Sequence, residues 1–373
     1  MQVLQFGKHY PPFVGGIEKV IQVLTETLNQ LGVKTDVLCV NHCSKYEELD
    51  LGTYKIYKMP LWFRVASTSI SPSLITKFRE IQGNYHIIHT HMPDPMANLA
   101  LFFFPPKSKL IVQWHMDIVR QKFLLPFYKP LLIWLFKRAD LILVSSEKLK
   151  NESQFSKFFN SKTKVLPLPF DYEEFEKIKI DLSFEKKIRE LAKEKKIILS
   201  VGRLVYYKGF DVLIKATKLL PENIVVFIVG DGPMKPSLEK LIEKLKLKDR
   251  VFLLGKLDRA KIAACYKICD LFCLPSTHKT ESFGIVQLEA MNFGKPVIST
   301  YLEASGICEV NKHGVTGLCV KPGDEKELAK AIIYLLENKV LYKTLSENAV
   351  IHVKNFYKEK IVNELIELYK SLL

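Results

Sequence analysis

Short apolar runs alternate along this chain with longer segments in which apolar residues recur every three or four positions. The opening VLQF is followed by a turn-rich loop, by a helical pattern from Ile17 to Leu31 that Gly32 closes, and by the apolar run TDVLCV. Short apolar runs are typical of buried strands, and recurrence at three and four positions is typical of a helix with one buried face. This part of the chain is therefore predicted to form a strand, a helix and a second strand.

Three more apolar runs in the first half predict further strands: HIIHT, KLIVQWH and DLILVSS. Strands that alternate with helical segments pair most economically as a parallel sheet with helices on both faces. The two prolines of VLPLPF make a stiff connector after these strands. We therefore expect a first domain over residues 1–170.

The second half repeats the rhythm through six successive strand and helix units, with strands that include IILSVGR, VVFIVGDG, RVFLLG, DLFCLPS and KPVIST. A chain of 373 residues also exceeds the length at which one hydrophobic core usually stops growing. The periodicity thus predicts an α/β protein of two doubly wound, Rossmann-like domains with a cleft between them. The second domain is expected over residues 171–354, and an amphipathic helix within 355–373 is expected to pack back on the first.

Composition narrows the class of protein. Hydrophobic residues make up 48% and charged residues 25%, which is typical of a globular chain. The start of the chain lacks the basic and apolar regions of a secretory signal, so we expect a cytoplasmic protein. The longest apolar stretch, FLLPFYKPLLIWLF, is interrupted by two prolines and a lysine and predicts no transmembrane helix.

The seven cysteines predict reduced thiols and not a disulfide framework. Cys265, Cys269 and Cys273 are four residues apart, but Cys273 falls in a predicted strand and no histidine lies beside them. Buried apolar cysteines are therefore favoured over a metal site.

The formal charge of +15 is unevenly spread. Residues 101–170 hold twelve Lys and Arg against four Asp and Glu, together with ten of the 23 phenylalanines. Basic and aromatic residues in one stretch suit the surface of an anionic membrane. No nucleic-acid motif accompanies the charge, so nucleic acid is not expected as a partner. A solvated basic face over an apolar core is the alternative.

Ligands of open α/β sheets bind beyond the carboxyl ends of the strands, so residues just after each predicted strand are the candidates. Gly15 and Gly16 lie between the first strand and the first helix, where backbone N–H groups can meet a phosphate or a sugar. The three-glycine dinucleotide fingerprint is absent, which counts against a nicotinamide enzyme. A flexible turn is the alternative role for these glycines.

Histidines follow two of the predicted strands. His115 ends KLIVQWH, so its imidazole, and with it the carboxylate of Asp117, is predicted at the edge of the cleft. His89 and His91 end the preceding strand, where they either contribute to the site or shape a loop. A structural role is the alternative for each of the three histidines.

Two cations follow the strand IILSVG. Arg203 comes directly after it, and Lys208 comes before Gly209 and a predicted helix, with no carboxylate between them. Because the amino end of a helix is also positive, an anion such as a diphosphate would relieve the repulsion. These two residues are predicted to bind an anion.

Two glutamates, Glu281 and Glu289, are separated by seven residues in ESFGIVQLE. Glu281 is predicted in a loop and Glu289 about two turns into the following helix, too far apart to act as one acid and base pair. They are suited to gripping two ends of an elongated ligand. Backbone N–H groups of four residues between them would face phosphate oxygens: Ser282, Phe283, Gly284 and Ile285.

Together these segments resemble the family-4 retaining glycosyltransferases of the GT-B fold. The resemblance rests on PPFVGGIEKV, HTHMPDP, QWHMDIVRQK, VGRLVYYKGFDVLIKA, VGDGP and ESFGIVQLEAMNFGKPVIST. The last of these matches the family's pattern of two glutamates separated by seven residues. The resemblance covers nearly the whole chain and is strongest to transferases that build bacterial O-antigen or other surface polysaccharides.

The resemblance implies a role for each candidate residue. Glu289 would bind the ribose, Glu281 the hydroxyls of the transferred sugar, and Arg203 with Lys208 the diphosphate. The backbone amides around Phe283 to Ile285 would complete the anion site. The remaining candidates would border the same ligand: Gly16 at the phosphates, His115 at the sugar, and Asp231 with Gly232 at the base.

The resemblance also implies a reaction. A hexose, with mannose from GDP-mannose favoured, would pass from a nucleotide-sugar to a lipid-linked or other glycan acceptor with retention of configuration. Glucose, N-acetylglucosamine or galactose from a UDP-sugar is the alternative donor group. No metal and no cofactor are expected, because fixed cations and a helix amino end would stabilise the departing diphosphate. The enzyme is expected at the cytoplasmic face of the inner membrane. A non-catalytic binder of nucleotide-sugars or of a membrane surface is the alternative of another class.

Overall fold

The computed structural model describes residues 1–12, 15–65, 68–119, 123–159 and 162–373. The chain divides into two compact units. The first consists of Met1–Phe170 and Lys358–Leu373, and the second consists of Asp171–Tyr357. Parts of two predicted motifs, residues 13–14 of PPFVGGIEKV and residues 120–122 of QWHMDIVRQK, lie outside the described residues.

The first unit is built on an eight-stranded sheet with the order β10-β9-β8-β7-β1-β2-β4-β3. Its strands are β1 (Gln2–Phe6), β2 (Lys34–Val40), β3 (Glu47–Asp50), β4 (Lys55–Met59), β7 (Ile87–Met92), β8 (Lys109–Trp114), β9 (Leu141–Val144) and β10 (Thr163–Val165). The strand order reverses between β1 and β7, because β1 pairs with β2 on one side and with β7 on the other. A two-stranded ribbon of β5 (Phe63–Val65) and β6 (Thr68–Ile70) is separate from this sheet.

One strand of the first sheet departs from the all-parallel arrangement predicted from the sequence. The edge strand β3 runs antiparallel to β4. Its residues EELD alternate between half-buried and exposed positions, as in an edge strand with one solvated face. Gly52 in the connecting turn has φ +81°, a left-handed conformation that favours glycine, so the chain can reverse within a few residues.

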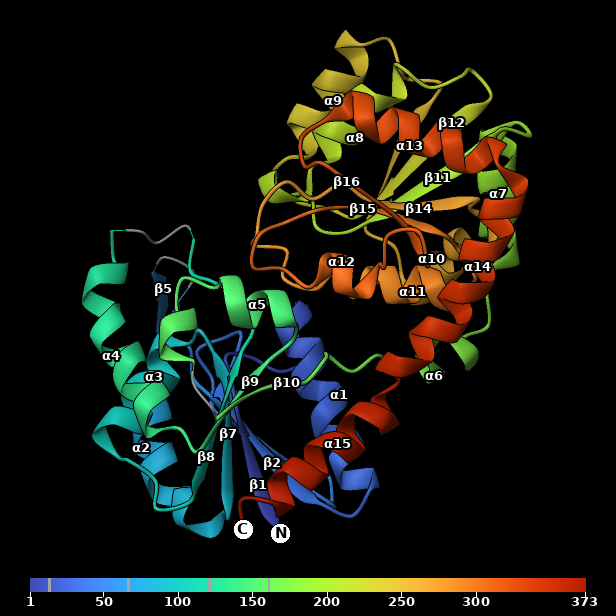
Figure 1. Ribbon diagram of the computed structural model, residues 1–373. Coiled ribbons are helices and arrows are strands. Elements are labelled where there is room, and N and C mark those ends of the chain that lie inside the picture. The colour runs from blue at the N-terminus through green and yellow to red at the C-terminus, as the bar shows by residue number, and fades with distance from the viewer. Residues whose placement is uncertain (13–14, 66–67, 120–122, 160–161) are drawn as a thin grey trace. The chain divides into compact units, whose positions relative to one another are not determined.

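Helices cover both faces of this sheet (Figure 1). They are α1 (Gly16–Gln30), α2 (Pro72–Ile81), α3 (Pro95–Phe103), α4 (Leu125–Arg138), α5 (Glu147–Glu152) and α15 (Lys358–Lys370). The last helix, α15, lies beside α1 on one face, whereas α2 and α3 lie on the other. The carboxyl-terminal helix therefore belongs to the core of the first unit.

The buried face of α1 follows the predicted period. Val20, Ile21, Leu24 and Leu28 are buried, and they recur at three and four positions. Gly32 follows the helix with φ +81°, and its N–H donates to the carbonyl of Asn29. A left-handed glycine at this place ends a helix without strain.

The second unit is built on a six-stranded parallel sheet with the order β13-β12-β11-β14-β15-β16. Its strands are β11 (Lys196–Val201), β12 (Ile224–Val229), β13 (Val251–Gly255), β14 (Leu271–Leu274), β15 (Val297–Thr300) and β16 (Gly317–Val320). The order reverses between β11 and β14. In open α/β sheets this reversal is where a crevice for ligands forms.

Helices also cover both faces of the second sheet. They are α6 (Glu173–Glu176), α7 (Leu182–Ala192), α8 (Phe210–Thr217), α9 (Lys235–Lys244), α10 (Arg259–Ile268), α11 (Val286–Asn292), α12 (Ile307–Val310), α13 (Glu325–Glu337) and α14 (Lys339–Val353). Helices α8, α9 and α13 lie on one face, with α7, α10, α11 and α14 on the other (Figure 1). The doubly wound fold class predicted from periodicity is confirmed in each unit.

The cysteines and the apolar stretches have structural roles. None of the seven cysteines, all of which lie in the described residues, forms a disulfide, and Cys265, Cys269 and Cys273 are buried in α10, after α10 and in β14 respectively. Burial raises the pKa of Cys265 and of Cys269 to about 12. Within the described part of the chain, every helix is too short or too polar to cross a membrane.

Candidate functional site

A buried ion pair lies where the strand order of the second sheet reverses. Lys208 follows β11 in a short 3₁₀ turn, and Glu281 lies in the loop between β14 and α11. Their Nζ and Oε2 atoms are 2.6 Å apart, and the two side chains are only 10% and 11% exposed. The hydroxyl of Ser276 also donates to Glu281, over 3.3 Å. Two residues that the sequence singled out independently are thus brought together.

Two glycines let the loops after β11 and β14 approach closely. Gly209 has φ +67°, and a Cβ there would lie 1.9 Å from the carbonyl oxygen of Pro275. A Cβ at Gly202 would lie 3.2 Å from the Nζ and Cε atoms of Lys208. The side chain of Lys208 therefore folds over the backbone at the end of β11, where a larger residue would displace it.

Arg203 lies near the same pair but is exposed. Burial and then the carboxylate of Glu281 raise the pKa of Tyr207 to about 12, whereas Arg203 acts in the opposite sense. Arg203 and Glu281 are therefore both close to Tyr207. Because Glu281 compensates the charge of Lys208, the exposed guanidinium of Arg203 provides the positive charge that is available to a ligand at this edge of the sheet.

Glu289 lies in the first turn of α11, so its predicted position about two turns into a helix is wrong. The helix begins only at Val286, because Gly284 adopts φ +72° and keeps the preceding residues in a turn. Glu289 is buried. Its position close to the start of the helix brings its carboxylate to the carboxyl edge of the sheet.

A network that sequence reasoning missed holds Glu289. The guanidinium of Arg259 donates to Glu289 Oε1 over 3.0 Å, and the hydroxyl of Tyr266 donates to Oε2 over 2.9 Å. Arg259 also pairs with Glu174 over 2.9 Å. Arg259 and Tyr266 both lie in α10. The apolar residues around Tyr266 in the sequence could have predicted that its side chain is buried, but not that it contacts Glu289. Glu289 is therefore fixed before any ligand binds.

Packing and hydrogen bonds hold the segment of residues 282–285 between the two glutamates. Phe283 is buried, and the amide of Gln287 donates to its carbonyl over 3.2 Å. A Cβ at Gly284 would lie 2.6 Å from the side chain of Leu274. The backbone N–H groups of this segment, which comprises Ser282, Phe283, Gly284 and Ile285, precede the first turn of α11. The amino end of a helix carries partial positive charge.

The loop after β12 meets the loop after β11. The N–H of Leu204 donates to the carbonyl of Asp231 over 3.0 Å, and a Cβ at Gly232 would lie 2.5 Å from the carbonyl oxygen of Leu204. The Asp231 side chain is exposed and accepts from the N–H of Gly232. Asp231 and Gly232 thus border Arg203 along the same edge.

In the first unit, Gly15 and Gly16 precede and begin α1. A Cβ at Gly15 would lie 2.0 Å from a carboxylate oxygen of Glu18, whereas a Cβ at Gly16 would meet no atom of the described residues within 4 Å beyond its chain neighbours and its own helix backbone. Burial raises the pKa of Glu18. The backbone at Gly16 is therefore open to a ligand, whereas a side chain at position 15 would displace the carboxylate of Glu18.

His115 lies directly after β8 and is buried. Its Nε2 is 2.9 Å from Nδ1 of His91, and its backbone N–H donates to Met92. The prediction that Asp117 emerges beside it is wrong. The carboxylate of Asp117 is buried and accepts from the hydroxyl of Ser153 and from the N–H of Gln154, so it ties two loops together.

His89 and His91 lie within β7, not in a loop, and both are buried. Burial lowers the pKa of His89 and of His115 to about 3 and lowers the pKa of His91 well below its usual value. All three imidazoles are therefore neutral near pH 7. The imidazole rings of His91 and His115 stack with their centres 5.2 Å apart.

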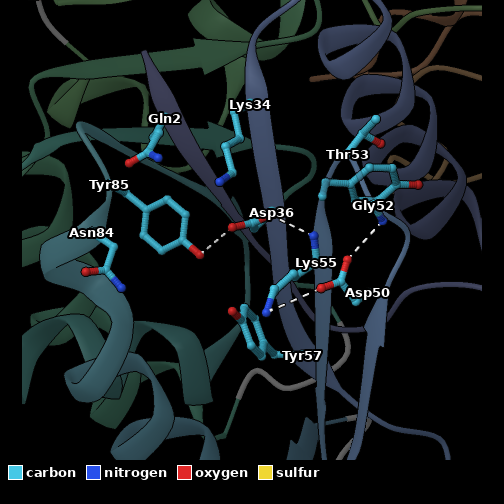
Figure 2. Close-up of a pocket in the computed structure, with 11 residues that line it drawn as sticks. Gln2, Lys34, Asp36, Asp50, Gly52, Thr53, Lys55, Tyr57, Asn84 and Tyr85 are labelled. Carbon is cyan, nitrogen blue, oxygen red and sulfur yellow. Dashed lines mark hydrogen bonds and ion pairs between the residues drawn. The ribbon is translucent and has the colours of Figure 1, made fainter.

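A cavity of about 420 Å³ lies at the opposite, amino edge of the first sheet, where β1, β2 and β4 begin (Figure 2). Its polar groups are bonded to one another. Asp36 accepts from the hydroxyl of Tyr85 over 2.8 Å and from the N–H of Lys55 over 2.7 Å, and Lys55 pairs with Asp50 over 3.5 Å. None of the residues predicted to bind a ligand lines this cavity.

The chain matches two family models. Residues 14–174 match the model described as Glycosyltransferase Family 4, and residues 182–350 match the model described as Glycosyl transferases group 1. Each model covers most of one compact unit.

Two characterised relatives align over nearly the whole chain. O-antigen chain mannosyltransferase C of Escherichia coli is 28% identical over 100% of this chain and 99% of its own length. D-rhamnosyltransferase WbpZ of Pseudomonas aeruginosa is 30% identical over 94% of this chain and 90% of its own length.

Solved structures share the fold. Alr3699/HepE of Anabaena, in complex with UDP, has a TM-score of 0.78 at 23% identity, and the alignment covers 100% of both chains. Sucrose-phosphate synthase of Thermosynechococcus elongatus has a TM-score of 0.82 at 21% identity, over 100% of this chain and 98% of its own. The chain therefore has the GT-B fold predicted from the resemblance.

The buried histidines predict how the stability of the first unit depends on pH. Between pH 6.5 and about 3 the unfolded chain binds protons at His89 and His115 that the folded chain does not, so stability falls as the pH falls. The loss is up to about 1.4 kcal/mol per pH unit for each histidine. Urea unfolding followed by tryptophan fluorescence measures this unit alone, because Trp62, Trp114 and Trp134 all lie in it.

The His89→Gln variant removes one of these histidines and is expected to flatten the pH dependence between pH 7 and 5.5. His352→Gln, a change in the second unit, serves as the control and is expected to leave it unaltered. An unfolding free energy of the wild-type unit that stays constant over this range would refute the explanation.

The buried ion pair predicts a strong coupling between Lys208 and Glu281. Lys208→Met leaves a buried carboxylate without its cation, which costs about 3–5 kcal/mol, and adding Glu281→Gln is expected to recover part of that loss. Lys215→Met breaks an exposed pair with Asp211 and is expected to cost less than about 1 kcal/mol. Differential scanning calorimetry measures these variants together with Glu281→Gln alone, and a loss in the double variant equal to the sum of the two single losses would rule out the coupling.

Proposed function

The chain belongs to the glycosyltransferase family that these two models describe, and from that premise we propose that it transfers a hexose from a nucleotide-sugar to a lipid-linked or other glycan acceptor in bacterial surface polysaccharide synthesis. That the chain is a glycosyltransferase follows from the family itself. The observation that carries the rest of the proposal is the Lys208–Glu281 pair, 2.6 Å apart at the reversal of the second sheet.

In this proposal the second unit holds the donor. Lys208 and Arg203 bind the diphosphate, together with the N–H groups of residues 282–285 at the start of α11. Glu281 accepts hydrogen bonds from hydroxyls of the transferred sugar, and Glu289 accepts them from the ribose. Support for these roles comes from the burial of both carboxylates and from the fixed position of Glu289 between Arg259 and Tyr266.

The first unit contributes His115 at the sugar and the open backbone of Gly16 at the phosphates. Gly16 is the first residue of a helix of 15 residues. The amino end of a helix carries a partial positive charge, which favours a bound anion. His115 is neutral, so it binds the sugar through a hydrogen bond and not through charge. Asp231 and Gly232 border the base.

We propose a reaction with retention of configuration and without a metal ion. The bond between the anomeric carbon and the phosphate oxygen breaks, and the acceptor hydroxyl forms the new bond on the same face. The leaving phosphate takes the proton of that hydroxyl. Lys208 and Arg203 stabilise the negative charge that builds on the diphosphate, a task that a divalent cation performs in other enzymes.

GDP-mannose is the favoured donor because a relative over the whole chain is an O-antigen chain mannosyltransferase. The second relative is a D-rhamnosyltransferase, which also transfers a hexose-derived sugar. UDP-sugars are the alternative, and one protein of the same fold has been solved in complex with UDP-glucose. A non-catalytic binder would not need to retain both cations and both glutamates in these positions.

A donor panel tests the proposal. The protein, a lipid-linked glycan acceptor and each of several GDP- and UDP-sugars are incubated, and nucleoside diphosphate release and product are measured. We expect one donor to be consumed, with no change on adding a chelator. Glu281→Gln, which keeps the size of the side chain, is expected to lower kcat/KM about 10- to 100-fold through the loss of a charged hydrogen-bond acceptor.

The matched control is Glu239→Gln, an exposed change in α9 that is expected to leave the rate unaltered. Binding of a nucleotide-sugar without any consumption would favour the non-catalytic alternative, and loss of activity with the chelator would overturn metal independence. Glu281→Ala is a poorer test, because it would leave the buried Lys208 without its partner.

We further propose that the first unit binds the cytoplasmic face of the inner membrane. Phe123 and Phe127, at the amino end of α4, are 93% and 84% exposed. The same helix ends in Lys137 and Arg138. Arg138 is bonded to Asp140 and to the carbonyl of Pro106, whereas Lys137 is exposed. Exposed aromatic rings at the start of this helix and an exposed lysine at its end suit an anionic bilayer, which attracts the charge and accepts the rings at its interface.

Flotation with anionic liposomes tests this contact. Exchanging both Phe123 and Phe127 for serine is expected to reduce the bound fraction at least tenfold. The reason is that two aromatic rings inserted into the membrane interface would contribute several kcal/mol to binding. Leu182→Ser, which removes a 66% exposed side chain from the second unit, is the control and is expected to bind normally. Equal flotation of the double variant and the wild type would contradict the proposed contact.

A further inference from the structure

A chain of hydrogen bonds connects His115 to the carboxyl-terminal helix through the interior of the first unit. His91 Nδ1 is 2.9 Å from His115 Nε2, and His91 Nε2 is 2.7 Å from Gln5 Oε1. The amide nitrogen of Gln5 donates to the hydroxyl of Tyr369 over 3.4 Å, and that oxygen is 2.6 Å from His89 Nδ1. All five side chains are buried.

The sheet arranges these residues by its alternation of faces. Gln5 of β1 pairs with His89 of β7, and His91 of β7 pairs with Gln113 of β8, so their side chains lie on one face. His115 lies two residues beyond Gln113 and continues that face. This is the face on which α15 brings in Tyr369.

The bonds have one consistent direction. A neutral imidazole has one N–H donor and one acceptor nitrogen. Since the Gln5 carbonyl is an acceptor, His91 Nε2 carries a proton and His91 Nδ1 does not. The proton between His91 and His115 therefore belongs to His115 Nε2, and His115 Nδ1 is left as an acceptor.

The other end of the chain agrees with this direction. Tyr369 accepts from the Gln5 amide, so its own proton goes to His89 Nδ1, and His89 Nε2 carries the remaining proton. Gln113 lies close enough to oppose the effect of burial on the pKa of His89, but His89 Nε2 and Gln113 Oε1 are both buried without a hydrogen-bond partner among the described residues. If the oxygen and nitrogen of the Gln5 amide were exchanged, donor and acceptor would have to be exchanged in every other hydrogen bond of the chain. His89 Nε2 would then lose its proton and direct a lone pair toward Gln113.

We propose that His91, Gln5 and Tyr369 are positioning residues that hold His115 in the tautomer with the proton on Nε2, so that Nδ1 accepts a hydrogen bond from a substrate hydroxyl. The carboxyl-terminal helix thereby sets the proton arrangement of a residue at the site in the first unit. The identity of the hydroxyl rests on the proposed function, but the tautomer of His115 in the free protein does not.

The test uses full-length protein labelled with ¹⁵N-histidine and no substrate. Correlation spectra between the ring nitrogens and ring hydrogens distinguish a protonated from an unprotonated nitrogen, and the signals that disappear in His115→Gln identify His115. At pH 7 we expect its Nε2 to be protonated and its Nδ1 to be unprotonated. An imidazolium or a proton on Nδ1 would overturn the proposal.

Tyr369→Phe removes the hydroxyl and keeps the ring, so Gln5 is free to turn. We expect both His115 nitrogens to move toward averaged shifts and kcat/KM for the donor to fall about tenfold, the effect of losing one hydrogen bond. Tyr85→Phe removes a buried hydroxyl bonded to Asp36 at the other edge of the same sheet and is the control. Unchanged His115 shifts in Tyr369→Phe would refute the role of the chain, whatever the activity assay shows.

Discussion

The second unit depends on one buried ion pair, formed by Lys208 and Glu281 at the reversal of the sheet. Either charge alone would be costly to remove from water, and together they are stable only if their loops approach closely. The chain meets this requirement with Gly209, whose left-handed backbone and missing Cβ let the loops after β11 and β14 meet. The pair thus places two buried, mutually compensating charges at the reversal of the sheet, where we propose that the donor binds.

In the described part of the chain, the first unit has buried polar groups, and not a buried ion pair, at the place where its strand order reverses between β1 and β7. Its interior there is polar but uncharged, because burial keeps His89, His91 and His115 neutral. Four of their ring nitrogens have hydrogen-bond partners, whereas His89 Nε2 has none within the described residues. Tyr369 supplies one of these partners from the last helix of the chain. The return of that helix to the first unit therefore serves polar groups as well as apolar packing.

Periodicity predicted the two doubly wound units, and placement after strands predicted Lys208, Glu281 and His115, because both signals are local in the sequence. Asp117 was misjudged because its partners Ser153 and Gln154 are more than 30 residues away. The depth of Glu289 in its helix was misjudged because Gly284 begins a turn and not the helix. Partners such as Arg259, Gln5 and Tyr369 come from distant elements, and no spacing in the chain connects them to the site.

We propose that the Lys208–Glu281 pair is the diphosphate and sugar site of this glycosyltransferase. A crystal structure of the protein with a nucleotide-sugar or its nucleoside diphosphate tests it most directly. We expect a phosphate oxygen within hydrogen-bond distance of Lys208 Nζ and ribose hydroxyls on the carboxylate of Glu289. A nucleotide bound elsewhere, with the environment of Lys208 and Glu281 unchanged, would contradict it.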